Sequence, residues 1–592
     1  MADDLSTYWK DLPSRETPLD ARTLNEWGAL VEERADDARG AAVTAAAARD
    51  EAISHVDLIA TPALEQVAAY IRGVGGQAVQ DALTERSAST NAATFGAAGD
   101  GAADDTTALQ AALNATAAAG VLYLPPGQYR TTGPLNWPSG VTIEGRGLAS
   151  LVVTGNYSAL TVGPGAADGW IRGVRFVGTM PTTGVATKAA QCGINIDATA
   201  AQRATGMRVE NCSFEGLEYI ALRAKHAYRL RVTGCTFDNY GYAGVGMYSP
   251  SDTEVQGNRF AGTGALPSYA SNSYAAFASI YEPDGDIGGP SNPRPSDVTF
   301  ISNTVRNQQW EGLDTHAGQR ISFIGNVFVD CPGNAIACVG IDTASPLGCV
   351  DITIANNEIT GPSGPQGVAR AGIILRGQSS ATPGAERCTG TITGNVMKWV
   401  GDADSTVSGG ILVANGQGVV VASNVIIEPR SNGIIAQDSI GTVIQGNTVR
   451  DVWKTAGTSS GFTTTLVADA VADTTLIGNR LLRGHLTPGA HIPAGASINL
   501  AGYHGTNSPG VTVYQEGNFF PPGTAFPGAV AHIRSGTRGT READGTAPPT
   551  TGAWATGDRI KNAAPAAGGA IGWVCISGGT PGNWKSYGAI SS

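Results

Sequence analysis

The stretch from Thr94 to Gly147, TFGAAGDGAADDTTALQAALNATAAAGVLYLPPGQYRTTGPLNWPSGVTIEGRG, indicates how the chain folds. An acidic loop leads to Thr106, a candidate helix N-cap, and a short helix follows with Leu109 and Leu113 on one side. Short extended segments come next, and Pro-Gly and Ser-Gly turns separate them. This order predicts one helix followed by a mainly β, turn-rich architecture.

Composition agrees with that architecture and excludes some functions. The 592 residues are too many for one compact core, and 80 glycines with 15% charged residues indicate many turns. A net charge of -12 argues against a nucleic-acid partner. Eight cysteines without any CxxC pair indicate buried thiols. We find no signal-peptide pattern and no run of about 18 apolar residues, so we expect a soluble protein without membrane insertion.

A short phrase with Asn or Cys at its centre recurs through residues 148–520, as in VENCSF, VQGNRF, FIGNVF and QGNTV. Its commonest interval is 23 residues, which suits one coil of a parallel β-helix with equivalent positions stacked about 4.8 Å apart. We predict an internal ladder of hydrogen-bonded Asn side chains, and packed thiols in place of a disulfide at the two cysteines. The markers are Cys212, Cys235, Asn258, Asn303, Asn326, Asn357, Asn395, Asn424, Asn447 and Asn479, with Asn518 as a candidate last member.

Three segments resemble known families. The phrases DGAADDTTALQAAL, LPPGQY and GVTIEGRG resemble, in that order, the N-terminal cap of the pectate-lyase-like superfamily. This resemblance implies a mainly β fold, a right-handed parallel β-helix plugged by a helix at its N-terminal end, and no particular reaction. Residues 1–28 resemble the arm that attaches phage tail fibres and spikes to the virion, an ordinary N-terminal arm being the alternative. The last segment resembles a small β module at the ends of phage spikes.

These features predict five parts of the chain. The stem carries small apolar residues on a roughly heptad track and would be weak as an isolated helix, so we expect partner chains and a homotrimer. The parts are a virion-attachment arm (1–28), a helical, coiled-coil-like stem (29–93), the β-helix cap (94–147), the parallel β-helix body (148–520) and a C-terminal β module (521–592).

The marker register also predicts which side chains face outward. Because alternate residues of a strand share a face, counting back from the markers puts Asp314 and His316 on one outer face. There we expect them to stack next to Gly246 and Tyr248 on one side and Ala337 and Val339 on the other, with Arg223, Arg376 and Gln437 further along. A groove parallel to the axis would suit a long polymer.

The segment WEGLDTHAG is the densest candidate for catalysis. Glycoside hydrolysis needs one protonated and one ionised carboxyl group. We predict Asp314 as the base that activates water and Glu311 or Glu282 as the proton donor, with Asp284 contributing from the longest interval between markers. The predicted substrate-binding residues are His316, Trp310, Arg223, Tyr248, Arg376 and Gln437.

Each candidate also has an ordinary explanation. Asp314 and His316 could be surface residues of a strand, and Glu311 a solvated turn residue. The acidic turn at Asp284 could bind calcium, and we expect no other metal or cofactor. Arginines in the groove would either be solvated or pair with carboxylates of an acidic substrate. In a lyase, His316 or an arginine would be the base.

The resemblances imply a phage tail spike of the polysaccharide depolymerase type, located in the virion tail. It would bind a bacterial surface polysaccharide and hydrolyse it during host adsorption, and its N-terminus would contact phage tail or baseplate proteins. Two alternatives stay open: a non-enzymatic receptor-binding tail fibre, and a polysaccharide lyase or epimerase with the same fold.

Overall fold

The computed structural model describes residues 89–592 except 182–185, 263–272, 281–290, 342–345, 363–370, 379–383, 402–407, 455–461, 466–472, 483–496, 499–502, 506–511, 517, 519–532, 535–541 and 552–553. The chain divides after Ala88. The predicted arm and the predicted stem up to residue 88 therefore lie outside the described residues. None of the described helices is long and apolar enough to cross a membrane.

The described part begins with a cap built around one α-helix. The helix α4 (Thr106–Ala115) buries Leu109 and Leu113 against the first coils. Its N-cap residue is Asp105, not Thr106 as predicted, because the carboxylate of Asp104 accepts hydrogen bonds from the Thr106 amide (3.1 Å) and hydroxyl (2.6 Å). The other cap elements are β1 (Thr90–Asn91), η1 (Ala92–Phe95), β2 (Asp100–Asp104), β3 (Val121–Tyr123), β4 (Gly127–Thr131) and β6 (Thr142–Val153).

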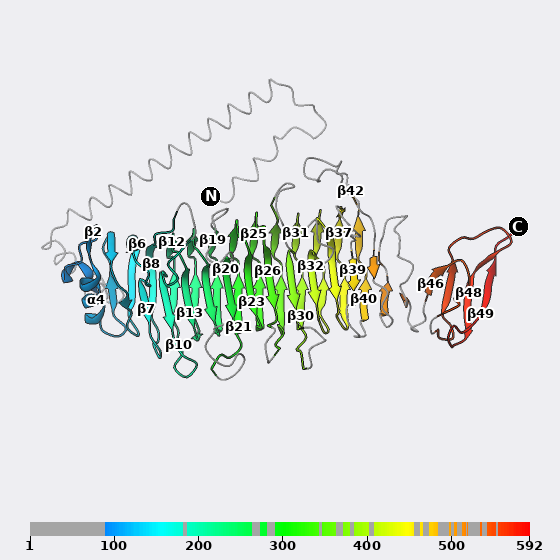
Figure 1. Ribbon diagram of the computed structural model, residues 1–592, viewed down its shortest axis with the longest axis horizontal. Helices are drawn as coiled ribbons and strands as arrows, with labels where there is room; N and C mark the ends of the chain where they lie inside the picture. The colour runs from blue at the N-terminus through cyan, green and yellow to red at the C-terminus, as the bar shows by residue number, and fades with distance from the viewer. Residues whose placement is uncertain are drawn as a thin grey trace, which may run out of the picture. The chain divides into compact units, whose positions relative to one another are not determined.

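The body is a stack of coils that form two long parallel sheets, so the predicted parallel β-helix is confirmed (Figure 1). One sheet has 13 strands and carries the site described below. In order it contains β5 (Leu135–Asn136), β7 (Leu160–Val162), β9 (Ile194–Asp197), β13 (Ile220–Lys225), β17 (Ala243–Tyr248), β20 (Tyr274–Ser279), β23 (Glu311–His316), β26 (Asn334–Val339), β29 (Ile373–Arg376), β32 (Gly409–Ala414), β35 (Asn432–Gln437), β39 (Phe462–Thr465) and β43 (Tyr503–Gly505).

The second sheet has 30 strands and bends at the repeated Asn and Cys markers. Before the markers stand β8 (Trp170–Val177), β11 (Arg208–Glu210), β15 (Arg231–Thr233), β18 (Ser251–Gln256), β21 (Ser296–Ile301), β24 (Gln319–Ile324), β27 (Ile352–Ala355), β30 (Gly390–Thr393), β33 (Val420–Ala422), β36 (Thr442–Gln445), β40 (Asp473–Ile477) and β44 (Thr512–Glu516). After them stand β12 (Ser213–Glu215), β16 (Thr236–Asp238), β19 (Arg259–Ala261), β22 (Thr304–Arg306), β25 (Val327–Val329), β28 (Glu358–Thr360), β31 (Val396–Lys398), β34 (Val425–Ile427), β37 (Thr448–Arg450) and β41 (Arg480–Leu482).

The markers form the predicted ladder inside the coil. The side-chain oxygen of Asn326 accepts from the amide of Asn303 (2.9 Å) and from its Nδ2 (3.0 Å), and Asn326 repeats this toward Asn357. Asn518 continues the ladder, since its side-chain oxygen accepts from the Asn479 amide at 2.8 Å. All eight cysteines are free and buried, so the expectation of packed thiols is confirmed. Stacked phenylalanines fill the interior beside the ladder, with ring centroids 4.7–4.8 Å apart from Phe176 through Phe260.

A column of glycine and alanine interrupts the regular pairing of the 13-stranded sheet. The pairing between β20, β23 and β26 passes over Ala275, Gly312 and Ala335. A Cβ atom on Gly312 would lie only 2.4 Å from the carbonyl oxygen of Ala335, so the backbones are too close there for a side chain on residue 312. Because of this irregularity, Glu311 faces the same side of the sheet as Asp314, three residues later.

The C-terminal segment contains a small separate sheet of four strands, β46 (Glu542–Gly545), β47 (Arg559–Asn562), β48 (Ala570–Ser577) and β49 (Asn583–Ala589). Ile560 and Cys575 are buried in it. Trp554 and Trp584 meet edge to face with ring centroids 5.0 Å apart, and both stay half-buried.

Candidate active site

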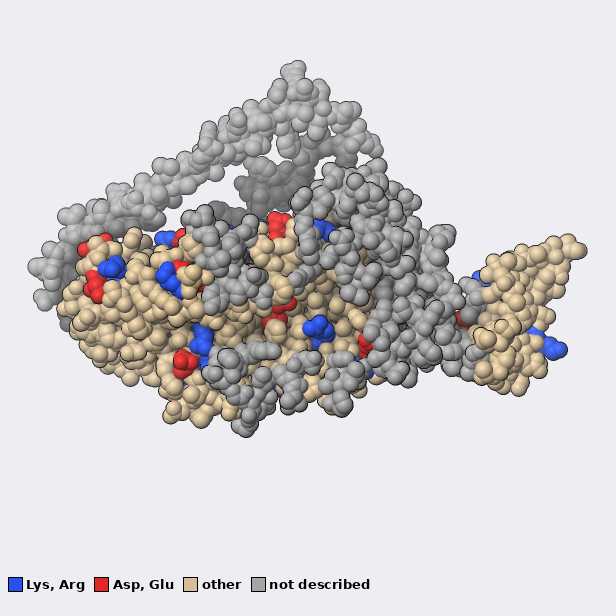
Figure 2. Space-filling model, in the orientation of Figure 1, with Lys and Arg blue, Asp and Glu red and all other residues tan. Residues whose placement is uncertain are grey.

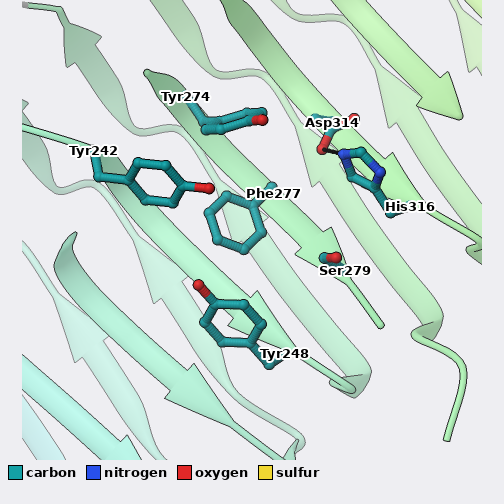
Figure 3. A pocket seen from close by; sticks show the side chains of 7 residues that line it. All are labelled: Tyr242, Tyr248, Tyr274, Phe277, Ser279, Asp314 and His316. Carbon is teal, nitrogen blue, oxygen red and sulfur yellow. Dashed lines mark ion pairs between the residues drawn. The ribbon is translucent and has the colours of Figure 1, made fainter. Parts of the chain in front are cut away.

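A pocket of about 200 Å³ opens on the outer face of the 13-stranded sheet. Strands β17, β20 and β23 supply its walls. Figure 3 shows aromatic side chains on one side and an acid–imidazole pair on the other. The volume is smaller than that of pockets for drug-sized ligands, about 300–1,000 Å³, so it would hold only a part of a long ligand. Its lining residues are Tyr242, Tyr248, Tyr274, Phe277, Ser279, Asp314 and His316.

The neighbours of Asp314 and His316 differ in part from the sequence prediction. Toward the C-terminus they pair with Ala337 and Val339, as predicted. Toward the N-terminus they pair with Phe277 and Ser279 of β20, and the predicted neighbours Gly246 and Tyr248 lie one strand further away. The reason is that strand β20 lies between the markers Asn258 and Asn303, with extra residues before and after it. Counting a fixed number of residues back from a marker therefore misses this strand.

Asp314 faces outward from the sheet but has 0% exposure, so the prediction that it lies on the outer surface is wrong in that respect. Aromatic side chains from the preceding strands cover it. Tyr274 and Phe277 meet edge to face with centroids 5.3 Å apart, and Tyr242 packs on both of them. A buried carboxylate needs a partner, because burial without one costs several kcal/mol.

His316 is that partner. Its Nε2 atom lies 3.0 Å from Oδ2 of Asp314, and its side chain is 25% exposed. Burial opposes the charged imidazolium, but the charge and hydrogen bond of Asp314 and the charge of Glu311 outweigh this, and together they raise the pKa of His316 to about 9. At neutral pH His316 therefore carries a proton, which makes it an acid or a hydrogen-bond donor. The alternative in which His316 is a base does not agree with this charge state.

Glu311 opens β23 and is only 6% exposed, so it is not a solvated turn residue. Nδ2 of Asn334 on the next strand donates to Oε1 of Glu311 at 3.1 Å. One ligand atom each of Glu311, Asp314 and His316 lies within 4.8 Å of the others, a spacing that could hold a metal ion. The imidazole nitrogen, however, already forms an ion pair with the Asp314 carboxylate at 3.0 Å.

Two tyrosines of the pocket keep their hydroxyl protons. Burial and the neighbouring Tyr219 raise the pKa of Tyr242 to about 12. Burial, then the charges of Asp314 and Glu311, raise the pKa of Tyr274 further above its usual value. Both hydroxyl groups are therefore donors at neutral pH and not tyrosinate bases.

The other predicted site residues lie at increasing distances from the pocket. Tyr248 lines it, and Trp310 packs against the outer aromatic cluster. Arg223 stands on β13, where Nη1 contacts Asn195 (3.0 Å) and Asp197 (3.6 Å).

Arg376 and Gln437 share the column of His316, two and four strands away. Strands about 4.8 Å apart put Gln437 about 19 Å from His316. The predicted acids Glu282 and Asp284 lie outside the described residues.

Sequence reasoning missed Tyr242, Tyr274, Phe277 and Ser279. A signal for three of them exists, because the segment YAAFAS has the length and apolar alternation of AGVGMY in β17, and it puts Phe277 and Ser279 at the positions of Gly246 and Tyr248. Figure 2 shows that acidic and basic side chains are scattered singly or in small groups over the described part of the face in view.

Comparison with known proteins gives one family match. Residues 89–336 match the family described as Rhamnogalacturonase A/epimerase, pectate lyase-like. The mannuronan C5-epimerase AlgE3 of Azotobacter vinelandii is 40% identical over 93 residues, covering 14% of this chain and 4% of the epimerase. The chain spans only 4–7% of the length of the curated relatives it matches.

Two solved structures are similar at low sequence identity. The A-module of mannuronan C-5 epimerase AlgE6 of Azotobacter vinelandii is 15% identical with a TM-score of 0.46, over 73% of this chain and 99% of that module. Tailspike protein 3 of bacteriophage CBA120 is 13% identical with a TM-score of 0.43, over 87% of this chain and 71% of that one. The sequence match over residues 89–336 and the stacked parallel sheets together identify the described body as a pectate-lyase-like right-handed parallel β-helix.

Proposed function

We propose that this protein is an enzyme that binds a polysaccharide along the outer face of the 13-stranded sheet and hydrolyses it at the Asp314 pocket. The observation that carries this proposal is the buried Asp314–His316 pair with Glu311 within 4.8 Å. Structural positions seldom keep two carboxyl groups and an imidazole together under an aromatic cover. The aromatic rings beside the pocket would stack on a sugar ring.

The spacing of the carboxyl groups suggests how the bond is cleaved. Retaining glycosidases place their two carboxyl groups about 5–5.5 Å apart, and inverting enzymes leave about 6.5–9.5 Å for a water molecule. With oxygens of Asp314 and Glu311 within 4.8 Å, the pair is closer to the retaining spacing than to the inverting one. Asp314 would attack the anomeric carbon, Glu311 would protonate the leaving oxygen, and the His316 imidazolium would orient the Asp314 carboxylate.

A lyase or epimerase is the second candidate, and the 93-residue match to a mannuronan C5-epimerase favours it. In such a reaction the protonated His316 would act as the acid and a carboxylate as the base. A fibre that binds the polysaccharide without cleaving it would use the same groove.

We further propose that the chain is a homotrimeric phage tail spike acting during host adsorption. Support comes from the tail-fibre resemblance of residues 1–28 and from the small apolar residues of the predicted stem. The molar mass in solution tests the trimer. Light scattering should give three times the chain mass of 60.4 kDa.

One assay separates the three activities. The full chain is incubated with surface polysaccharide from candidate hosts, and new reducing ends and the ultraviolet absorbance of an unsaturated sugar are followed. Reducing ends alone support hydrolysis, and both signals support a lyase. A changed sugar configuration in the uncleaved polymer supports an epimerase, and retained binding without any of these changes supports a fibre. Asp314→Asn should lower cleavage by about a thousandfold or more while binding persists. Cleavage at the wild-type rate in this variant would show that the site is elsewhere.

A further inference from the structure

Arg376 is the next charged side chain on the outer face beyond the pocket. The strand register places Val339 of β26 between His316 and Arg376 in one column. With neighbouring strands about 4.8 Å apart, the backbones of His316 and Arg376 are about 10 Å apart. This is a distance that two groups on a sugar chain can bridge.

The two arginines of the groove have different surroundings. Arg223 is engaged by Asn195, by Asp197 and by the ring of Tyr248, whose centroid lies 5.4 Å from the guanidinium. Arg376 is exposed, and its side chain makes no hydrogen bond or ion pair with the described residues. As far as the described residues show, Arg376 therefore has donors available to a ligand that Arg223 uses within the protein.

The floor between His316 and Arg376 is uncharged. Ala337 and Val339 of β26 form it, and the outward residues of the following strands in the Asp314 column are Ile374, Leu412 and Ile435. The positive charge of Arg376 acts on His316 and opposes its protonation. Two cations thus face each other across an apolar strand, and an anion placed between them would remove their repulsion.

We propose that an acidic group of the polysaccharide, a carboxylate or a sulfate, binds over β26 between His316 and Arg376. The substrate is then an anionic polysaccharide, and Arg376 determines this specificity. The inference deepens the proposed function, on which it rests for the assumption that the polymer follows this face. The net charge of -12 repels polyanions at long range, so their binding needs such a local pair of cations. A guanidinium suits the role because it can donate two parallel hydrogen bonds to a carboxylate or sulfate.

The test measures binding in the Glu311→Gln background, which lacks the proposed proton donor, so turnover does not interfere, and keeps the Asp314 carboxylate that holds His316 protonated. Retention in native gels that contain polygalacturonate, dextran sulfate or neutral dextran gives an apparent affinity for each polymer. Arg376→Gln is compared with Arg208→Gln, which removes the same charge from an exposed position on β11 of the other sheet. We expect Arg376→Gln to weaken binding of at least one polyanion about threefold to tenfold at low salt, and Arg208→Gln to leave it unchanged.

Carboxylate and sulfate specificity are told apart by which polyanion is retained. Equal losses in the two variants, unchanged binding in Arg376→Gln, or retention of dextran as strong as that of the polyanions would overturn the inference. So would a protein that retains neither polyanion. Because this readout needs no cleavage, lost binding in Arg376→Gln with no enzymatic activity would support the anion site and refute the hydrolase. Normal cleavage by the otherwise unchanged protein, together with unchanged polyanion binding in Arg376→Gln, would support the hydrolase and refute the anion site.

Discussion

The Asn ladder inside the coil and the pocket on its outer face are built from the same parallel register, yet they differ in how their polar groups are paired. In the ladder, each of the buried side chains from Asn303 to Asn447 both accepts and donates hydrogen bonds along the axis. In the pocket, Asp314 is equally buried but has an ion pair with His316 and no further hydrogen bond to the residues that the structure describes. Buried polar groups that stabilise the fold have all their hydrogen bonds within the protein, as in the ladder. A buried group with unused hydrogen-bonding capacity, such as Asp314, can use that capacity for a substrate.

The largest effect should come from breaking the ladder. Asn326→Ala removes the partners of the Asn303 amide, of the Phe300 carbonyl and of Asn357. Each buried polar group left unpaired costs about 1–3 kcal/mol, so we expect at least about 3 kcal/mol of lost stability.

Thermal and denaturant unfolding of the variant measure this loss, and faster unfolding is expected where the transition is irreversible. Asn114→Ala is the control, because this exposed residue of α4 takes part in one side-chain bond with Gln110. If both variants lost the same stability, the ladder would not be the stabilising column.

A smaller loss of stability is expected from Gly312→Ala. This variant tests whether the irregular pairing at residue 312 is what brings Glu311 next to Asp314. The added Cβ would lie 2.4 Å from the Ala335 carbonyl oxygen and 2.7 Å from the ring of Phe328. The backbone must shift to relieve this contact, and we expect the shift to lower the free energy of unfolding by about 1–3 kcal/mol. The same shift should turn Glu311 away from Asp314 and lower the cleavage rate about tenfold.

Unfolding and initial rates are measured on the same preparation. Gly163→Ala serves for comparison, because nothing lies within 4 Å of a Cβ atom there. A Gly312→Ala protein with wild-type rate and reduced stability would show that Glu311 does not take part in catalysis.

The His316–Asp314 pair should make the pocket, but not the ladder, sensitive to pH. The pKa of His316 is raised from 6.5 unfolded to about 9 folded, so its contribution to stability is fully present below pH 6.5 and is lost as pH rises through about 9. The loss should amount to roughly 1–3 kcal/mol.

Unfolding temperatures measured between pH 6 and pH 10 should therefore fall more steeply for the wild type than for His316→Gln. The variant Asn326→Ala should keep the wild-type slope, because amides do not titrate in this range. Parallel curves for wild type and His316→Gln would mean that the imidazole is not held protonated.

The smallest effect should come from the rim of the pocket. Tyr248→Phe keeps the ring next to Phe277, where the centroids are 5.3 Å apart, and removes only the hydroxyl. We expect KM to rise about threefold with kcat unchanged, since one hydrogen bond is worth about 1 kcal/mol. Tyr123→Phe on the cap strand β3 is the matched control. A drop in kcat with constant KM would instead give Tyr248 a chemical role.

The regular features of the body could be predicted from the sequence because each is repeated. The recurring phrase around Asn located the ladder, including Asn518, and the alternation of residues along a strand put Leu313 inside and Asp314 outside. Arg376 and Gln437 lie further along the face of His316, as predicted, since the insertions before them do not disturb the pairing of β26 to β35.

The candidate site could be predicted only in part, because it lies where the repeat is broken. Strand β20 occupies a coil with extra residues on both its sides, and its Tyr274 and Phe277 bury Asp314. Glu311 reaches the site through the irregular pairing at Gly312, which has no counterpart in simple alternation of residues.

By itself, the sequence determined the parallel β-helix, the Asn column and the face on which Asp314 lies, because stacking identical positions repeats one local preference in every coil. Only the tertiary structure decided that Asp314 is buried, that His316 holds a proton beside it and that the Arg376 side chain has no partner among the described residues. These properties depend on which strands become neighbours after insertions of unequal length, and distances and dielectric surroundings of that kind are not written in any single segment.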